Sequence, residues 1–206
     1  MKKVIYIYVL DTLADWEIGY ILQAISMQSM IKEPKYKVKT VGRTKDSIKT
    51  LGGLTLTPDC SIEEIIDKEI AALLLPGADT WKEDAQKPIL NIAVSCIEKG
   101  VLVGAICGAT LALAELRILN NHLHTSNSCE YLCSFSKNYT GKSFYIDELS
   151  VTDGNIITAS SAGGLLWAKH IIEYLNIYTS ETIEAWYKYY LTGDAKYYME
   201  MLSSLQ

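Results

Sequence analysis

The stretch Val101-Leu-Val-Gly-Ala-Ile-Cys-Gly-Ala-Thr-Leu-Ala-Leu-Ala114 decides the fold. Its first part, Val101–Ile106, is a short apolar run typical of a buried strand, and Ala109–Leu116 is rich in strong helix formers. Cys107 lies between the two parts, next to Gly108, and small neighbours let a strand and a helix approach closely. The pattern predicts a nucleophile elbow, a sharp turn that lifts the Cys107 side chain out of the sheet.

A cysteine in such a turn has two interpretations. At a helix N-terminus, the helix dipole and free N–H groups favour the thiolate, and the same N–H groups can hold an oxyanion. Most free cysteines, however, are simply small buried hydrophobes. The pattern leaves both open for Cys107. The other four cysteines have no small-residue elbow and are expected to be structural: Cys60, Cys96, Cys129 and Cys133.

Composition limits the class of protein. A chain of 206 residues, 49% hydrophobic and 21% charged, is ordinary for a globular protein, and we expect one domain over 1–206 with C-terminal helices in 178–206. The net charge of -5 gives no reason to expect nucleic acid or an anionic membrane as partner. Five cysteines without paired spacing suggest neither a disulfide framework nor a metal site, and we expect no cofactor. The N-terminal apolar run is too short for a signal peptide, so we expect a cytoplasmic protein.

Strands and helices alternate before the elbow. Glu17 lies in the first turn of an expected helix, with Asp15 as its N-cap, just past the first strand. Its carboxyl either complements the helix dipole or points over the carboxyl edge of the sheet, where sites of open α/β folds form. Gly77 follows another strand, and it marks either a plain turn or an amide that completes an oxyanion hole with Gly108. Five elements are expected before the elbow: a strand at Val4–Leu10, a helix at Asp15–Gln28, strands at Tyr36–Val41 and Ile70–Leu75, and a helix at Pro88–Lys99.

Two turn motifs complete this half: a hairpin or irregular strand pair over Thr44–Thr57, and a capping box, Ser61-Ile-Glu-Glu64, that opens a short helix. The alternation predicts an α/β fold with a mostly parallel sheet covered on both faces.

The chain after the elbow carries the histidines. His122 and His124 fall on the same side of an expected strand, His122–Ser126. If that strand ends near Cys107, either His124 or Asn127 reaches the sulfur, whereas His122 is set back. The remaining elements are a helix at Ser128–Ser136, strands at Ser143–Ile146, Leu149–Thr152 and Asn155–Thr158, a small-residue loop at Ala159–Gly164, and helices at Leu165–Leu175, Glu181–Leu191 and Ala195–Leu205. Asp153-Gly154 predicts a hairpin between the last two of these strands.

Five segments, taken in order, resemble the ThiJ/PfpI family, whose members are relatives of class I glutamine amidotransferase domains. The resemblance extends to about Leu175. Its segments are Ala14-Asp-Trp-Glu17, Leu75-Pro-Gly-Ala-Asp-Thr-Trp81, Ala105-Ile-Cys-Gly-Ala-Thr110, His124-Thr-Ser-Asn127 and Asp153-Gly-Asn-Ile-Ile-Thr-Ala-Ser160.

The resemblance implies a flavodoxin-like three-layer α/β/α sandwich, commonly a homodimer. It implies that Cys107 is the exposed nucleophile and that Glu17 lies beside the sulfur, its carboxyl often protonated and hydrogen-bonded to it. A negative charge beside a carboxyl raises its pKa, which agrees with that state. Gly77 and Gly108 match the family's backbone oxyanion positions.

The chain departs from the family's pattern at two positions. Protease-like members have a histidine where this chain has Gly108, and other members have one near the cysteine where this chain has Asn127, with His124 three residues earlier. The form His-Thr-Ser-Asn resembles an amidotransferase-like branch. A Cys–His pair is the usual way to make a thiolate, so hydrolysis by the ordinary acyl-enzyme route lacks its base. His170-Ile-Ile-Glu173 has the wrong spacing for a glutaminase His-x-Glu and is expected on a helix surface.

These residues support three functions. The first is a cysteine-dependent enzyme acting on a small carbonyl or amide substrate: a hydrolase, an amidotransferase-like protein or an aldehyde-processing enzyme. In it Cys107 attacks, Glu17 moves a proton and Asn127 orients the thiolate or a substrate amide. The second is a redox or stress-response protein in which Cys107 is oxidised to a sulfinic acid. The third is a binding module without turnover.

Overall fold

The computed structural model describes residues 3–205, and a seven-stranded sheet is its centre. The strand order is β5-β2-β1-β6-β7-β9-β8, and every neighbouring pair is parallel except the last, in which β8 runs antiparallel to β9. A separate hairpin pairs β3 with β4. The strands are β1 (Lys3–Tyr8), β2 (Tyr36–Gly42), β3 (Ile48–Lys49), β4 (Thr55–Leu56), β5 (Cys60–Ser61), β6 (Ile70–Leu75), β7 (Leu102–Ile106), β8 (Ser150–Asp153) and β9 (Ile156–Ala159).

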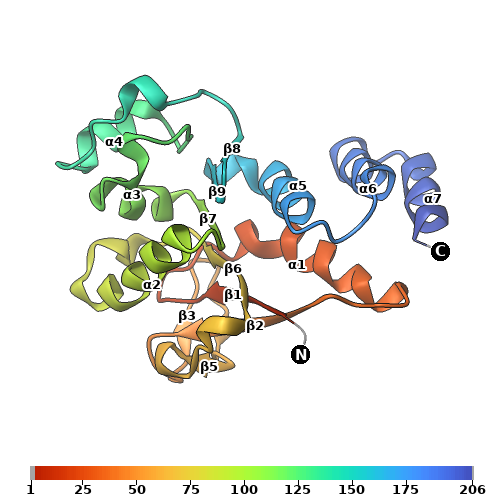
Figure 1. Cartoon of the computed structure of the whole chain (residues 1–206), viewed down its shortest axis with the longest axis horizontal. Coiled ribbons are helices and arrows are strands. Elements are labelled where there is room, and N and C mark those ends of the chain that lie inside the picture. The colour runs from red at the N-terminus through yellow and green to blue at the C-terminus, as the bar shows by residue number, and fades with distance from the viewer. Residues whose placement is uncertain (1–2, 206) are drawn as a thin grey trace.

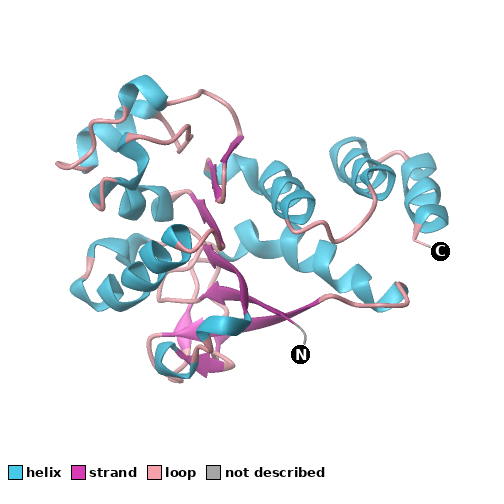
Figure 2. Cartoon of the chain, viewed as in Figure 1, coloured by secondary structure: helices cyan, strands magenta, loops and turns pink. Residues whose placement is uncertain are grey.

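Helices cover the sheet on both faces (Figure 1, Figure 2). On one side lie α2, α3 and α4, and on the other lie α1 and α5, with α6 and α7 outside them (Figure 1). The helices are α1 (Gly19–Ser26), α2 (Lys87–Glu98), α3 (Gly108–Glu115), α4 (Cys129–Phe135), α5 (Gly164–Tyr174), α6 (Ser180–Thr192) and α7 (Ala195–Ser204). The flavodoxin-like sandwich with a mostly parallel sheet, predicted from the sequence, is therefore confirmed.

The strand order places the elbow beside the point where the chain changes from adding strands on one side of β1 to adding them on the other. From β1 the chain goes to β2 on one side, and β6 then pairs on the other side of β1. In open α/β sheets, crevices form outside the carboxyl ends of the strands at such a reversal. The segments after β1, β6 and β7 carry Glu17, Gly77 and Cys107, so the topology gathers all three at one edge.

Several local predictions differ from the structure. Asp15 is not an N-cap, because its carboxylate accepts hydrogen bonds from the Thr50 hydroxyl and the Gly52 N–H of the β3–β4 hairpin instead. The helix expected over 15–28 is α1 flanked by two 3₁₀ turns. The strands expected at 122–126 and 143–146 reduce to one isolated bridge, between His124 and Tyr145.

Other turn predictions are confirmed. Glu64 accepts a hydrogen bond from the Ser61 N–H at 2.9 Å, as a capping box requires, although only one 3₁₀ turn follows it. The β8–β9 hairpin turns at Gly154, whose φ of 56° suits glycine. None of the helices between residues 3 and 205 combines the length and the apolar character that crossing a bilayer requires.

The first prediction concerns Gly104, in the middle of β7. A Cβ there would lie 2.9 Å from Leu74 Cδ2 and 3.0 Å from Trp167 Cζ2, both in fully buried side chains. Because close-packed cores resist added volume, Gly104→Ala is expected to lower the free energy of unfolding by about 1–3 kcal/mol in urea denaturation. Gly19→Ala is the control, since a Cβ there meets nothing within 4 Å, and it should not destabilise. Equal stability of wild type and Gly104→Ala would contradict this packing.

Candidate functional site

Cys107 forms the turn between β7 and α3, as the sequence predicts. Its φ of 55° and ψ of -122° lie in a region that non-glycine residues rarely adopt. The turn is held on both sides, because the Cys107 N–H donates to Ala159 O at 3.0 Å and the Cys107 carbonyl accepts from Thr110 N and Thr110 Oγ1. The side chain is half-buried at the carboxyl edge of the sheet, so a strained and well-held backbone presents the sulfur.

Glu17 lies beside this sulfur, in the 3₁₀ turn Asp15–Ile18 before α1, and is only 1% exposed. Its Oε2 accepts a hydrogen bond from Gly77 N at 2.7 Å, and its Oε1 accepts one from Ser161 Oγ at 2.8 Å. A Cβ on Gly77 would lie 2.7 Å from Glu17 Oε2 and 2.8 Å from Cys107 Cβ. Only glycine therefore fits at position 77 while the carboxyl and the cysteine remain together.

Asn127 contacts the sulfur from the other side. Its Nδ2 donates to Cys107 Sγ at 3.2 Å, and its Oδ1 accepts from Ser161 N at 2.9 Å. Asn127 thus joins the sulfur to the loop that also carries the Ser161 hydroxyl. The orientation of the thiol by Asn127 was one of the roles expected from the sequence, and the geometry is compatible with it.

The electrostatics of the Cys107–Glu17 pair are set by burial. Burial raises the pKa of the Glu17 carboxyl, while the hydrogen bonds from Ser161, Gly77 and Cys107 act in the opposite direction. Burial also raises the pKa of the Cys107 thiol, and the charge of Glu17 adds to this effect. The Asn127 and Ser161 hydrogen bonds lower the pKa of the thiol. Because the charge of Glu17 opposes ionisation of the thiol, while a hydrogen bond from the protonated thiol favours the Glu17 carboxylate, the pair favours a single shared proton.

The Gly77 N–H does not have the oxyanion-binding role expected from the sequence. Its N–H is already used by Glu17 Oε2, so Gly77 positions the carboxyl and has no free donor for an oxyanion. Gly108 opens α3, and its N–H has no partner within the helix. The Ala78 N lies 3.3 Å from where a Cβ on Gly108 would be, and Ala78 donates no hydrogen bond to another described residue. The Ala78 amide is therefore a donor beside Gly108 without a hydrogen-bond partner among the described residues.

His124 does not meet the sulfur. It is fully buried, its Nε2 is 2.8 Å from Tyr139 Oη, and its Nδ1 is 2.7 Å from His122 O. Both ring nitrogens are therefore occupied, and burial lowers the pKa of His124, which favours the neutral ring. The expectation that His124 reaches Cys107 is corrected: the strand on which that expectation depended does not form. His122 instead contacts Asp153, with Nδ1 3.0 Å from Oδ2.

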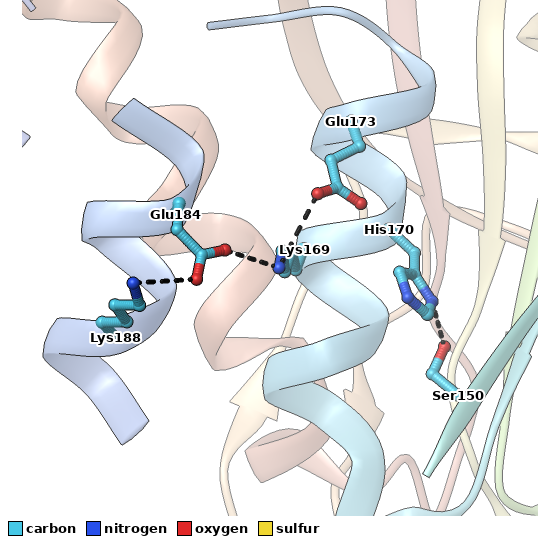
Figure 3. Close-up of polar contacts among 6 residues, drawn as sticks. All are labelled: Ser150, Lys169, His170, Glu173, Glu184 and Lys188. Atoms are coloured by element: carbon cyan, nitrogen blue, oxygen red, sulfur yellow. Dashed lines mark hydrogen bonds and ion pairs between the residues drawn. The ribbon is translucent and has the colours of Figure 1, made fainter. Parts of the chain in front are cut away.

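His170 is also away from the site. Its Nδ1 lies 3.0 Å from Ser150 Oγ, on the side of α5 that packs against β8 (Figure 3). It is half-buried rather than on the helix surface as expected. Within residues 3–205, no three His, Cys, Asp or Glu side chains gather in a way that could hold a metal ion.

Comparisons with known proteins identify the family of the chain. The family model described as DJ-1/PfpI family matches residues 2–174. The chain belongs to the DJ-1/PfpI family. Two similar proteins cover nearly all of it. One is the Bacillus subtilis protein named uncharacterized protease YoaZ, 36% identical over 98% of this chain and 97% of its own. The other is a solved thiJ/pfpI family protein from Bacillus anthracis, 35% identical, with a TM-score of 0.92 over 99% of this chain and 97% of that chain.

A more distant relative has a more specific name. It is a glutathione-independent glyoxalase of Caenorhabditis elegans, 23% identical over 62% of this chain and 66% of its own. The DJ-1/PfpI match ends at residue 174, before α6 and α7 begin. The two C-terminal helices therefore lie outside the part of the chain that matches the family model.

Sequence reasoning missed Ser161 and Tyr131 at this site. Ser161 comes from the small-residue loop after β9, and nothing in that loop marks one of its two serines as a ligand of Glu17. Tyr131 lies on α4, and the charge of Cys107 adds to burial in raising the pKa of its phenol. The tyrosine was hidden in an ordinary helical pattern, four residues beyond Asn127.

The second prediction tests the Asn127 contact. Asn127→Ala removes the donor to the sulfur, so the pKa of Cys107 is expected to rise by about one to two pH units, as for the loss of a hydrogen bond to a charged group. The measurement is the pH dependence of iodoacetamide alkylation, followed by mass spectrometry of the Cys107 peptide. Ser128→Ala is the matched control, because it weakens the cap of α4 without touching the sulfur. An unshifted midpoint in Asn127→Ala, or an equal shift in both variants, would refute the role of this amide.

Proposed function

We propose that this chain is a cysteine-dependent enzyme that acts on a small carbonyl or amide substrate. The observation that carries the proposal is the Cys107 turn, whose strained backbone holds a half-buried thiol against the Glu17 carboxyl at the carboxyl edge of the sheet. Strain of this kind gathers at functional sites, and a perturbed acid beside a nucleophile is typical of catalysis. The relatives named protease and glyoxalase support the same first step, attack on a carbonyl carbon.

In the proposed reaction, the Cys107 sulfur forms a bond to the carbonyl carbon while the thiol proton passes to the Glu17 carboxylate. The carbonyl electron pair moves onto oxygen, and the N–H groups of Gly108 and Ala78 stabilise the oxyanion. Glu17 then returns the proton, to the oxygen of a hemithioacetal or to the leaving amine of an amide. In the amide case, water hydrolyses the thioester that remains. In the case of a 2-oxoaldehyde such as methylglyoxal, a proton moves from C1 of the hemithioacetal to C2 through an enediol, which gives a thioester, and water then releases the hydroxy acid. Glu17 thus does the proton transfer that a histidine does in a Cys–His pair.

A second candidate is oxidation of Cys107 itself, which the absence of a histidine base favours. None of the three histidines hydrogen-bonds to this sulfur within residues 3–205. In that case hydrogen peroxide oxidises the Cys107 thiolate to a sulfinic acid while the buried Cys60 and Cys96 stay reduced, and no carbonyl substrate is turned over.

The homodimer and the cytoplasmic location expected from the sequence stay predictions.

The third prediction is the direct test of the enzyme. Wild-type protein is assayed for consumption of methylglyoxal and for release of ammonia from glutamine. Turnover of at least one of them is expected, and Cys107→Ser should reduce it to the background rate because the hydroxyl is a far weaker nucleophile beside a carboxylate. Cys133→Ser is the control, since Cys133 is exposed on α4 and has no part in the proposed step. Equal rates in wild type and Cys107→Ser would refute the proposal.

The fourth prediction concerns the pH dependence. Burial raises the pKa of Glu17 above its ordinary 4.5, and the carboxylate is the required base, so kcat/KM should fall with acid around a midpoint above pH 4.5. Glu17→Gln is expected to lower kcat by about 10²–10⁴-fold, the usual range for general acid–base catalysis, and to lose this acid limb. The residual rate should follow ionisation of the thiol alone. An acid limb retained in Glu17→Gln would assign it to another group.

A further inference from the structure

A cavity of about 480 Å³ opens next to Glu17, on the side of the α1 and α5 helices. Its size is within the usual range for small-molecule pockets. Three aromatic side chains give it an apolar character, and one of them, Trp16, leaves an indole that is 56% exposed at its rim. The principal lining residues are Trp16, Glu17, Tyr20, Gln23, Ser161 and Tyr190.

Helix α6 supplies the outer wall of this cavity, although it lies beyond the family-matched segment. The Tyr190 ring packs edge-on against Tyr20 of α1, with 5.3 Å between ring centroids. One turn earlier on α6, the fully buried Trp186 donates from Nε1 to Gln23 Oε1 at 2.6 Å. These two contacts seat α6 on α1, so the position of the Tyr190 ring is fixed by packing.

Ion pairs hold the same helix against α5 (Figure 3). Lys169 Nζ lies 2.8 Å from Glu184 Oε2 and 3.8 Å from Glu173 Oε1, and Lys188 Nζ lies 3.3 Å from Glu184 Oε1. The Lys169 side chain is only 18% exposed and also lies over the Tyr187 ring, at 4.6 Å from its centroid. Partly buried pairs of this kind are less screened by salt than surface pairs, and they fix α6 relative to α5.

Two residues connect the cavity to the sulfur. Glu17 and Ser161 line the cavity, they hydrogen-bond to each other, and both act on the pKa of Cys107. A group seated in the cavity therefore meets two residues whose side chains also interact with the Cys107 thiol. The cavity and the nucleophile belong to one continuous region of the molecule.

We infer that this cavity binds an apolar, preferably aromatic, part of the substrate, and that α6 determines this selectivity. The inference depends on the proposed function, in which the carbonyl lies at Cys107. A planar ring can lie against the exposed Trp16 indole and the packed Tyr20–Tyr190 pair, where aromatic contacts are favourable. Carbonyl or amide compounds that carry a phenyl-sized group then bind more tightly than the smallest members of the class.

The test measures occupancy without turnover. Phenylacetamide and acetamide, both unreactive toward iodoacetamide, are added while alkylation of Cys107 is followed by mass spectrometry. Phenylacetamide should protect Cys107 at a concentration about ten- to hundredfold lower than acetamide, since a buried ring contributes apolar transfer free energy that a methyl group lacks. Tyr190→Ala should abolish that preference. Tyr197→Ala, which removes an equal ring from α7 away from the cavity, should keep it.

A second variant guards against misfolding of Tyr190→Ala. Ala162 is exposed and lines the cavity from the α5 side, so Ala162→Phe fills the space without removing any packed side chain, and it too should abolish the preference. The same preference in wild type and in both variants, or none in wild type, would overturn the inference. Since no step of the assay requires catalysis, a protected Cys107 without turnover would refute only the proposed function.

Discussion

The backbone of Cys107 is the constraint on which the rest of the site depends. A non-glycine residue at φ 55° and ψ -122° costs about 1–3 kcal/mol, and the cost persists only because the surroundings over-determine the turn. One hydrogen bond ties its N–H to β9 and two tie its carbonyl to Thr110, so the strain is borne by a fully buried strand and a nearly fully buried helix. Two glycines then allow the close approach: Gly77 leaves room for the Glu17 carboxyl, and Gly108 lies against the Ala78 carbonyl, only 2.6 Å from where its Cβ would be. Removing either glycine would move the sulfur or its acid.

The second consequence of this geometry is electrostatic. A buried carboxyl in contact with a half-buried thiol puts two acids where neither ionises freely, and both pKa values are raised by burial. The surrounding polar groups act on different members of the pair. The Gly77 N–H favours the Glu17 carboxylate, and Asn127 Nδ2 favours the Cys107 thiolate. The Ser161 hydroxyl lowers the pKa of both groups. The site is therefore balanced between two states, one with the proton on Cys107 and one with the proton on Glu17, and the thiol is not permanently ionised. Such a balance suits a nucleophile that transfers its proton as it attacks, and it limits indiscriminate reaction of the sulfur when no substrate is bound.

The sequence predicts the part of this site that depends on local chemistry. The small residues around Cys107 predict the elbow, and the position of Glu17 just after a buried strand predicts a carboxyl over the edge of the sheet. The sequence predictions fail where the site depends on contacts between residues that are far apart in the chain. Ser161 reaches Glu17 across 144 residues, and no local signal distinguishes it from Ser160. His124 was expected on a strand, but only one bridge forms there, and Tyr139 and the His122 carbonyl occupy its ring nitrogens. Gly77 was expected to offer a free amide, yet the buried carboxylate that it accommodates takes that amide, because a buried carboxylate without donors would be unstable.

The C-terminal helices lie outside the family match, yet one of them, α6, forms part of the cavity beside the site. The residues that hold the sulfur and its acid all lie between 17 and 161, inside the matched segment, whereas the wall of the adjoining cavity comes from Tyr190, outside it. That wall is attached by an indole–amide hydrogen bond to α1 and by ion pairs to α5, neither of which touches Cys107. Changes in α6 can therefore alter the shape of the cavity without disturbing the elbow. Under the proposed function, this arrangement separates the reacting groups from the groups that select the substrate, so that either set can vary while the other is kept.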